Sequence, residues 1–269
     1  MTAAAEIKAC CAAAYGSEAV RWLLGDRQHP GGARLTAELI HSLGARPGML
    51  VADIACGTGA SALQAAARTG CDVIGIDLSE GNIEAARTAA AAAGLDGCVR
   101  FAVGDAEQLP LADGAVDGVL CECALCTFPD KRAAASEIAR VLRPGGVLAL
   151  SDMTADAARL PDELRSLDAR IACIGDAWPL GELADLLADS GLPVEHRERH
   201  DEALAELVEC AGGRLHLARA AAASMPAALG GSIERGLAIT AAARRAIADA
   251  ALGYAVIIAR RRPGAPSPS

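Results

Sequence analysis

The sequence contains few aromatic side chains and carries more negative than positive charge. Phenylalanine, tryptophan and tyrosine together make up 2% of the 269 residues, which is too few to build stacking platforms for nucleobases. The 25 lysines and arginines are outnumbered by 34 aspartates and glutamates, so the formal net charge is −9. A nucleic-acid partner, which would be held through phosphate contacts, is therefore not expected.

Long apolar runs are also absent. No uninterrupted apolar stretch reaches the roughly 18 residues of a membrane span, because arginines, aspartates and glutamates break even the alanine-rich segments. The first residues, MTAAAEIKACC, lack the apolar core of a signal peptide. We therefore expect a cytoplasmic protein without a membrane partner. Its 52% hydrophobic residues are sufficient for a sizeable core.

Strand-like and helix-like patterns alternate between residues 49 and 151. The expected strands are Leu50–Ala55, Asp72–Asp77, Val99–Val103, Val116–Cys121 and Gly146–Ser151, and the expected helices are Ala60–Thr69, Gly81–Ala93 and Lys131–Leu142. Such alternation, with short glycine-rich turns, predicts a Rossmann-like α/β fold with a doubly wound, mostly parallel sheet. Two later strands, 193–199 and Gly253–Arg260, bring the expected total to seven.

The segments around this unit suggest four parts. They are a helical N-terminal segment or lid (1–44), a cofactor-binding domain (45–155), acceptor-site helices with the last two strands (156–260) and a disordered tail (261–269). The alanine-rich block 202–251 is a helical insertion between the last two strands. We expect it to cover the ligand edge of the sheet.

A glycine-rich turn, Ala55-Cys56-Gly57-Thr58-Gly59, follows the first expected strand. Its glycines let the backbone approach a ligand closely, and the next helix offers free N–H donors. About twenty residues later Asp77, followed by Leu78, ends the second strand, where a carboxylate accepts hydrogen bonds from ribose hydroxyls. We interpret Asp77 as a solvent-facing acid that contributes little to the core. The pattern predicts a site for an adenosine-type cofactor.

The same turn satisfies the dinucleotide fingerprint, so it does not by itself identify the cofactor. Asp53, four residues before Gly57, can face an ammonium group, and Asp105-Ala106 ends the third strand, where the acid can accept from an adenine amino group. With Arg143-Pro144-Gly145-Gly146, these features resemble class I methyltransferases that use S-adenosylmethionine. The resemblance implies that cofactor as a ligand, with further contacts from Tyr15 and Cys121.

The cysteines carry a closer resemblance, to the arsenite methyltransferases. The similar segments are Cys126-Thr127-Phe128-Pro129-Asp130-Lys131, Cys173-Ile174-Gly175-Asp176-Ala177, Glu206-Leu207-Val208-Glu209-Cys210 and Lys8-Ala9-Cys10-Cys11. The resemblance implies that Cys173 and Cys210 are As(III) ligands and that a thiol reductant is a partner. Because Asp26 stands where the family has another cysteine, the third thiolate would come from Cys10 or Cys11, or from Cys123 or Cys126, or be absent. Cys126 is a further candidate, and soft As(III) suits thiolate sulfur.

Several alternatives remain open. The chain could methylate a small organic acceptor or thiol, with incidental cysteines, or bind a metalloid without catalysis. Cys121, Cys123 and Cys126 could hold zinc, although no second cysteine pair or histidine cluster lies nearby. The turn-forming stretch that begins at His29 is an inter-helix turn or part of a lid. Three scaffold cysteines are expected to be small buried residues, namely Cys56, Cys71 and Cys98.

Overall fold

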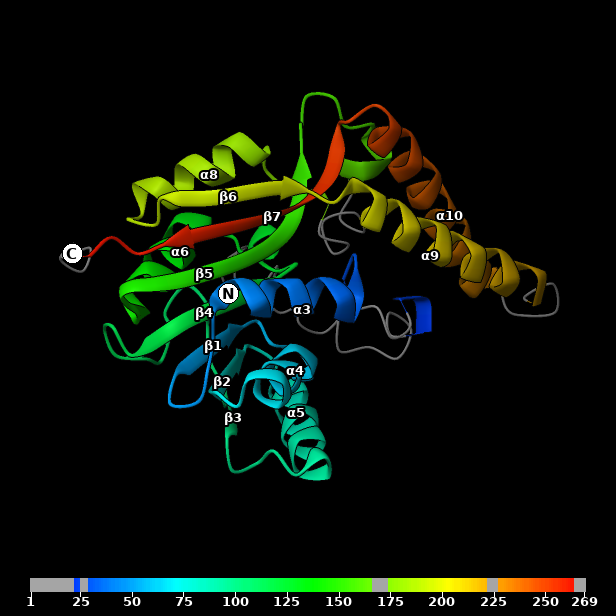
Figure 1. The fold of residues 1–269 in the computed structure, drawn as a ribbon. Helices are drawn as coiled ribbons and strands as arrows, with labels where there is room; N and C mark the ends of the chain where they lie inside the picture. Colours follow the sequence, from blue (N-terminus) through cyan, green and yellow to red (C-terminus); the bar gives the residue numbers. More distant parts are fainter. Residues whose placement is uncertain (1–21, 25–28, 166–173, 222–226, 264–269) are drawn as a thin grey trace.

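The computed structural model describes residues 22–24, 29–165, 174–221 and 227–263 (Figure 1). Seven strands form one sheet in the order β3-β2-β1-β4-β5-β7-β6. They are β1 (Leu50–Ile54), β2 (Asp72–Asp77), β3 (Val99–Val103), β4 (Val116–Glu122), β5 (Leu142–Ala155), β6 (Val194–Arg199) and β7 (Leu252–Arg260). Only β7 pairs antiparallel with its neighbours, β5 and β6. The predicted seven-stranded, mostly parallel Rossmann-like sheet is confirmed.

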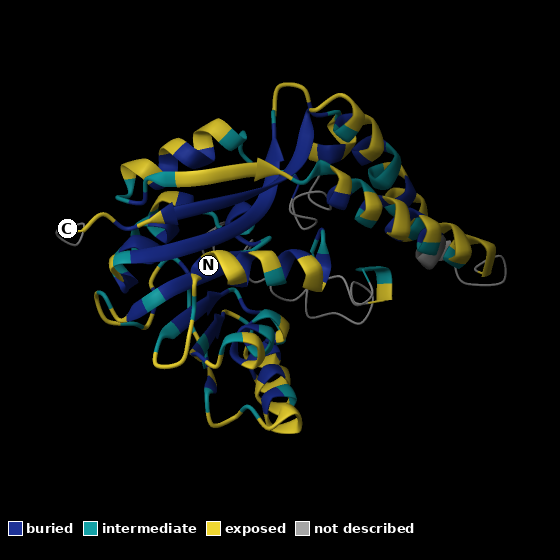
Figure 2. Ribbon diagram, viewed as in Figure 1, coloured by how far each residue is buried: buried dark blue, intermediate teal, exposed yellow. Residues whose placement is uncertain are grey.

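Helices cover both faces of this sheet. The described helices are α3 (Gly32–Leu43), α4 (Ala60–Thr69), α5 (Glu80–Ala93), α6 (Lys131–Val141), α8 (Leu180–Asp189), α9 (Asp201–Ala221) and α10 (Ala227–Ala248), with short 3-10 turns η1 (Leu125–Thr127) and η2 (Asp162–Arg165). α3, α4 and α5 pack into one core cluster, and α6 and α8 into the other. Because side chains alternate along a strand, Leu120 of β4 belongs to the α3 side and Cys121 to the α6 side. Figure 2 shows the central strands buried between helices whose outer faces are exposed.

The helical insertion between β6 and β7 consists of two helices, α9 and α10. They pack against each other, and both also contact β7. Figure 1 shows that the pair extends away from the sheet. The predicted helical character of this block is confirmed for residues 201–221 and 227–248, and its expected cover over the ligand edge stays a prediction.

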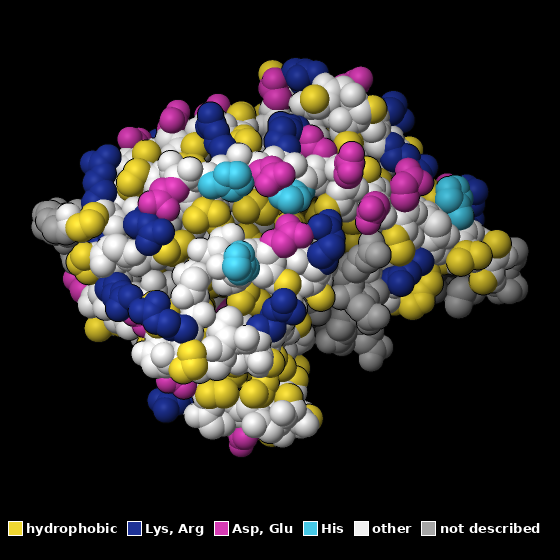
Figure 3. Space-filling view, viewed as in Figure 1, with side chains coloured by type: hydrophobic (Ala, Val, Ile, Leu, Met, Phe, Trp, Pro, Cys, Tyr) yellow, Lys and Arg dark blue, Asp and Glu magenta, His cyan; other side chains and the backbone are white. Residues whose placement is uncertain are grey.

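The outer edge of the sheet is β6, whose residues after Val194 are all exposed. His196 and His200 each lie near the Glu198 carboxylate, with His Nε2 to Oε2 distances of 3.5 and 3.8 Å. Figure 3 shows positive, negative and histidine side chains interspersed over this face of the molecule. Charged side chains on an edge strand oppose pairing with another chain. No trio of metal-ligating side chains is found in the part of the chain that the structure describes.

The chain remains ordered beyond β7, where the sequence predicts a disordered tail. Arg261 is 5% exposed, and its guanidinium donates to the carbonyls of Arg140, at 3.0 Å, and Leu142. Its backbone also exchanges hydrogen bonds with Gly145 and Gly146. These bonds to the β5 end of the sheet hold a residue that composition alone assigns to the tail. Residues 264–269 of the expected tail lie outside the described residues.

Two glycines make room for the Phe101 ring of β3, which is 6% exposed. A Cβ on Gly75, in the neighbouring strand β2, would lie 2.5 Å from Phe101 Cδ1, and one on Gly59 would lie 2.7 Å from Phe101 Cζ. Gly59 also has a φ of 83°, which a side chain rarely adopts. The aromatic ring therefore packs directly against backbone beneath the glycine-rich turn.

Replacing Gly75 by alanine should force the Phe101 ring out of position. We expect Gly75→Ala to lower the free energy of unfolding by about 1–3 kcal/mol, the usual range for overpacking, measured by urea denaturation. Gly97→Ala is the matched control, because a Cβ at Gly97 meets nothing within 4 Å. Equal stability of the two variants would contradict this account of the packing, and Phe101→Leu should partly restore Gly75→Ala.

Candidate cofactor and acceptor site

The strand order reverses between β1 and β4, because the chain runs from β1 outward to β2 and β3 and then returns to β4. Ligands of open α/β sheets bind at such a reversal, beyond the carboxyl ends of the strands. Both strands are followed by a residue in the left-handed region, Ala55 with φ 57° and Cys123 with φ 52°. The chain therefore turns away from the sheet on both sides of the crevice, and a pocket lies there.

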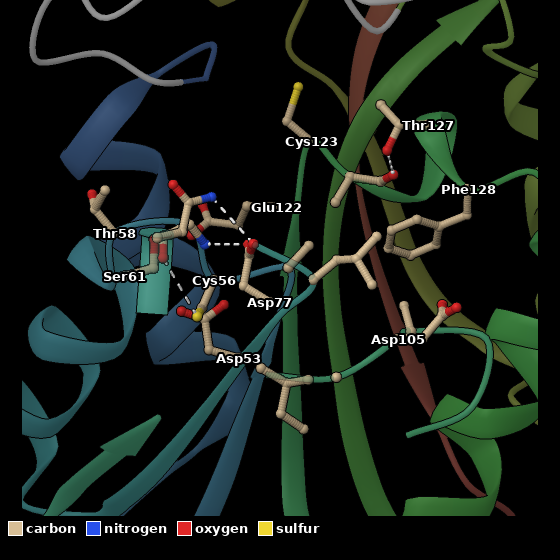
Figure 4. A pocket seen from close by; sticks show the side chains of 18 of the residues that line it. Asp53, Cys56, Thr58, Ser61, Asp77, Asp105, Glu122, Cys123, Thr127 and Phe128 are labelled. Atoms are coloured by element: carbon tan, nitrogen blue, oxygen red, sulfur yellow. Dashed lines mark hydrogen bonds between the residues drawn. The ribbon is translucent and has the colours of Figure 1, made fainter. Parts of the chain in front are cut away.

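The pocket is elongated, and acidic side chains occur along its length (Figure 4). Thr58 and Ser61 lie at one end, Asp105 and Phe128 at the other, and Asp77 between them. The lining also includes Ala55, Gly57, Leu78 and Ala106. Gly59 and Cys121, which the sequence also predicts as cofactor contacts, are not among the lining residues. Gly59 caps α4, and Cys121 is completely buried.

Asp77 is held firmly by backbone and side-chain donors. Its Oδ2 accepts from the Gly57 N–H at 2.8 Å, and its Oδ1 accepts from the Ser79 N–H at 2.9 Å and the Asn82 amide at 3.1 Å. With 8% exposure it is buried, so the interpretation of Asp77 as a solvent-facing acid was wrong. Donors from two loops meet at this carboxyl group, which therefore supports the glycine-rich turn and also lines the pocket.

Asp53 is 2% exposed, and its Oδ2 has no hydrogen-bond partner. Burial raises the pKa of the Asp53 carboxyl well above its usual value, and the nearby charges of Glu122 and Asp77 raise it further. A buried carboxylate without a partner is costly. The arrangement is therefore suited to a positively charged group that enters the pocket.

Glu122, at the end of β4, is a pocket residue that the sequence reasoning missed. Its carboxylate accepts from the Thr36 hydroxyl of α3 at 3.0 Å, and its Oε2 lies 3.5 Å from His29 Nε2. His29 lines the same pocket. The sequence signal for Glu122 was the alternation along β4, which puts Glu122 on the same face as Leu120.

Opposite this acidic end, Asp105 and Leu78 line the pocket. Asp105 Oδ1 accepts from the Glu107 N–H at 2.9 Å, which fixes the turn after β3. Leu78 is 41% exposed although it is a large apolar side chain. An exposed apolar surface beside a carboxylate suits a flat ring that carries an amino donor.

The described cysteines do not gather at one site. Cys123 lines the pocket and is half-buried, whereas Cys126 is buried in η1 and its N–H donates to Asp152. Burial raises the pKa of the Cys121 thiol well above its usual value, which disfavours the thiolate that a metal needs. Cys210 is exposed on α9 and lines a separate hollow.

Several predicted site residues lie outside the described residues. They are Cys10, Cys11, Tyr15 and Cys173. The distance between the proposed ligands Cys173 and Cys210 is therefore not defined, and their role stays a prediction. The zinc alternative has no support in the described part of the chain, where no group of three metal-ligating side chains occurs.

Comparison with known proteins identifies the central part of the chain. Residues 52–150 match the family model described as a methyltransferase domain. The phosphoethanolamine N-methyltransferase 2 of Haemonchus contortus, solved with S-adenosyl-L-methionine, has the same fold, with a TM-score of 0.74 and 20% identity over 91% of this chain and 56% of that one. The fold is thus the Rossmann-like fold of the class I methyltransferases.

Curated relatives methylate different acceptors. An O-methyltransferase of Pyrenophora dematioidea is 39% identical over 46% of this chain and 46% of its own length. The arsenite methyltransferase of Halobacterium salinarum is 32% identical over 58% of this chain and 40% of its own length. The chain spans about half the length of the curated relatives it matches. In the described residues, no helix has the length and apolar character of a membrane span.

Asp53→Asn should stabilise the protein in a pH-dependent way. Because the pKa of Asp53 is raised in the folded state, the wild type loses stability as pH rises through that pKa and the buried carboxyl ionises. Asparagine keeps the shape without the charge. We expect the variant to gain about 1–3 kcal/mol in the free energy of unfolding above that pKa and nothing in acid.

Urea denaturation over a series of pH values, with ligand-free protein, measures this gain. Asp96→Asn is the control, because Asp96 is exposed. A difference between Asp53→Asn and wild type that is the same at every pH would argue against an uncompensated buried charge.

Proposed function

We propose that this protein transfers the methyl group of S-adenosylmethionine to a small-molecule acceptor. The observation that carries the proposal is the series of carboxylates along the pocket at the β1/β4 reversal, which ends at Asp53 and its unpartnered Oδ2. The methyltransferase-domain match over residues 52–150 supports it. The sequence resemblance to the class I enzymes agrees with both.

The pocket residues fit this cofactor. Asp105 and Leu78 would hold the adenine, through its amino group and its ring face. Asp77 Oδ2 accepts one backbone N–H and, having a second lone pair, would accept from a ribose hydroxyl. Asp53 Oδ2 would take the ammonium group, which would satisfy this buried oxygen that has no partner.

The cofactor supplies an electrophilic methyl group on a positively charged sulfur. The chain contributes charge and position: its carboxylates favour a cation in the crevice, and Asp53, Asp77 and Asp105 would hold the cofactor at three points along the pocket. Correct positioning of two reactants is worth on the order of 7–11 kcal/mol of the barrier. Cys123 and Thr127 also line the pocket and would contact an acceptor there.

Among acceptors, we favour a small organic molecule with a hydroxyl group. Several relatives named as O-methyltransferases support this choice, with identities of 36–39% over part of the chain. The described cysteines also support it, since Cys126 and Cys210 do not line the pocket.

Thiolate-bound As(III) is the second candidate. It is favoured by the Cys123 thiol on the pocket wall and by the Halobacterium salinarum relative. Under this reading, Cys173 and Cys210 would hold the metalloid, with Cys10 or Cys11 as a third ligand, and a thiol reductant would be required. No general base is needed, because the attacking lone pair carries no proton.

Cofactor binding can be tested with two apolar residues that are similarly exposed. Leu78 lines the pocket and Val103 does not, and their exposed fractions are 41% and 49%. In titration calorimetry with S-adenosylmethionine, Leu78→Ala should weaken binding by roughly fivefold, about 1 kcal/mol, and Val103→Ala should leave it unchanged. Tight binding of NAD with no binding of S-adenosylmethionine would refute the proposed function.

The acceptor can be tested by measuring S-adenosylhomocysteine release with and without As(III) plus glutathione. If As(III) is the acceptor, release depends on it and Cys210→Ser abolishes it, because chelation loses a thiolate. Cys71→Ser, at a buried scaffold cysteine, should retain turnover. Release that is independent of As(III), or unaffected by Cys210→Ser, would remove the metalloid candidate.

A further inference from the structure

His29 and Glu122 meet at the α3 side of the pocket, although they come from distant parts of the chain. His29 precedes α3, and Glu122 ends β4. Their side chains are 13% and 5% exposed, and His29 Nε2 lies 3.5 Å from Glu122 Oε2. Thr36 of α3 joins them, because its Oγ1 lies 3.2 Å from His29 Nε2 and donates to Glu122 at 3.0 Å.

The turn before α3 fixes the position of His29. The Gly32 N–H donates to the His29 carbonyl at 3.2 Å, and Gly31 has a φ of 80° with no room for a Cβ, which would lie 2.6 Å from Leu35 Cβ. A glycine at position 31 is thus needed for this geometry. The turn sets an imidazole at the start of a helix whose first N–H groups have no side-chain cap.

His29 is the only basic side chain among the described residues that line the pocket, against four carboxylates. Both of its ring nitrogens face oxygens, Nδ1 the Pro30 carbonyl at 3.1 Å and Nε2 the Thr36 hydroxyl. The Nε2 contacts are long and shared between two oxygens, so this donor can turn to a stronger acceptor.

A hydrogen-bond donor, His29, and an acceptor, Glu122, therefore lie side by side at one end of the pocket. The uncapped N-terminus of α3 adds partial positive charge next to His29. Asp53 Oδ2, buried and unpartnered, adds an acceptor on the other side, near Glu122. An α-amino acid group, with an ammonium and a carboxylate on one carbon, has the matching pair of charges.

We propose that His29 and Glu122 form a zwitterion clasp for the amino-acid end of the cofactor. His29 holds the carboxylate through a charge-assisted hydrogen bond, and Glu122, with Asp53, accepts from the ammonium group. This inference rests on the proposed function, since it concerns the same pocket. It makes the turn before α3 a determinant of cofactor specificity.

Three ligands separate the two halves of the clasp. They are S-adenosylmethionine, decarboxylated S-adenosylmethionine, which lacks only the carboxylate, and 5′-methylthioadenosine, which lacks the whole amino-acid end. His29→Gln should weaken binding of the first by about tenfold and leave the other two within about threefold. Glu122→Gln should weaken the first two, which carry the ammonium group, and spare the third.

Titration calorimetry on the full chain provides the dissociation constants, and thermal unfolding checks that each variant is folded. His41→Gln is the matched control, because His41 is exposed in the last turn of α3. Equal weakening of all three ligands, or no weakening, would overturn the clasp while leaving the proposed function intact. Failure of the wild type to bind S-adenosylmethionine would overturn both.

Discussion

The buried carboxyl of Asp53 is the constraint on which the rest of the site depends. It sits at the end of a central strand with an unsatisfied oxygen, and the charges of Glu122 and Asp77 oppose its ionisation. A fold tolerates such a group only when the surrounding packing over-determines it. Here that packing comes from helices on both faces and from Phe101, seated against the backbone of Gly59 and Gly75. The buried Asp53 carboxyl lowers the stability of the fold locally and favours the binding of a cation in the pocket.

Most of the sheet could be predicted from sequence because its signals are local. The strands at Asp72–Asp77 and Val99–Val103 and the helix Ala60–Thr69 have the predicted bounds, since each is a periodic apolar run closed by turn residues. The position of the acids at strand ends could be predicted for a related reason. Parallel strands bring their carboxyl ends to one edge, so Asp53, Asp77 and Asp105 could be assigned to one pocket before any coordinates were known.

What the sequence could not supply depends on contacts between distant elements. Thr36 and Glu122 are 86 residues apart, and nothing near either residue predicts that α3 packs over the end of β4. The side-chain environment of Asp77 was missed for a similar reason, because one of its donors, the Gly57 N–H, comes from another loop. For the cysteines, the local spacing suggested a proximity that the fold does not provide. Their spacing after β4 suggested one cluster, but Cys121 lies in the core on the α6 side, whereas Cys123, in the left-handed region, and Cys126 contact the core on the α3 side.

The position of β7 has a consequence for how the chain assembles. β7 comes last in sequence but lies between β5 and β6, and it is the only described strand that pairs with β6. During synthesis, the cofactor half of the sheet can form while β6 still lacks a partner. The sheet is complete only when residues 252–260 emerge and insert between two strands made earlier. A ribosome-bound nascent chain would thus already contain the glycine-rich turn and its acids, with an open edge on β5 where β7 will be placed.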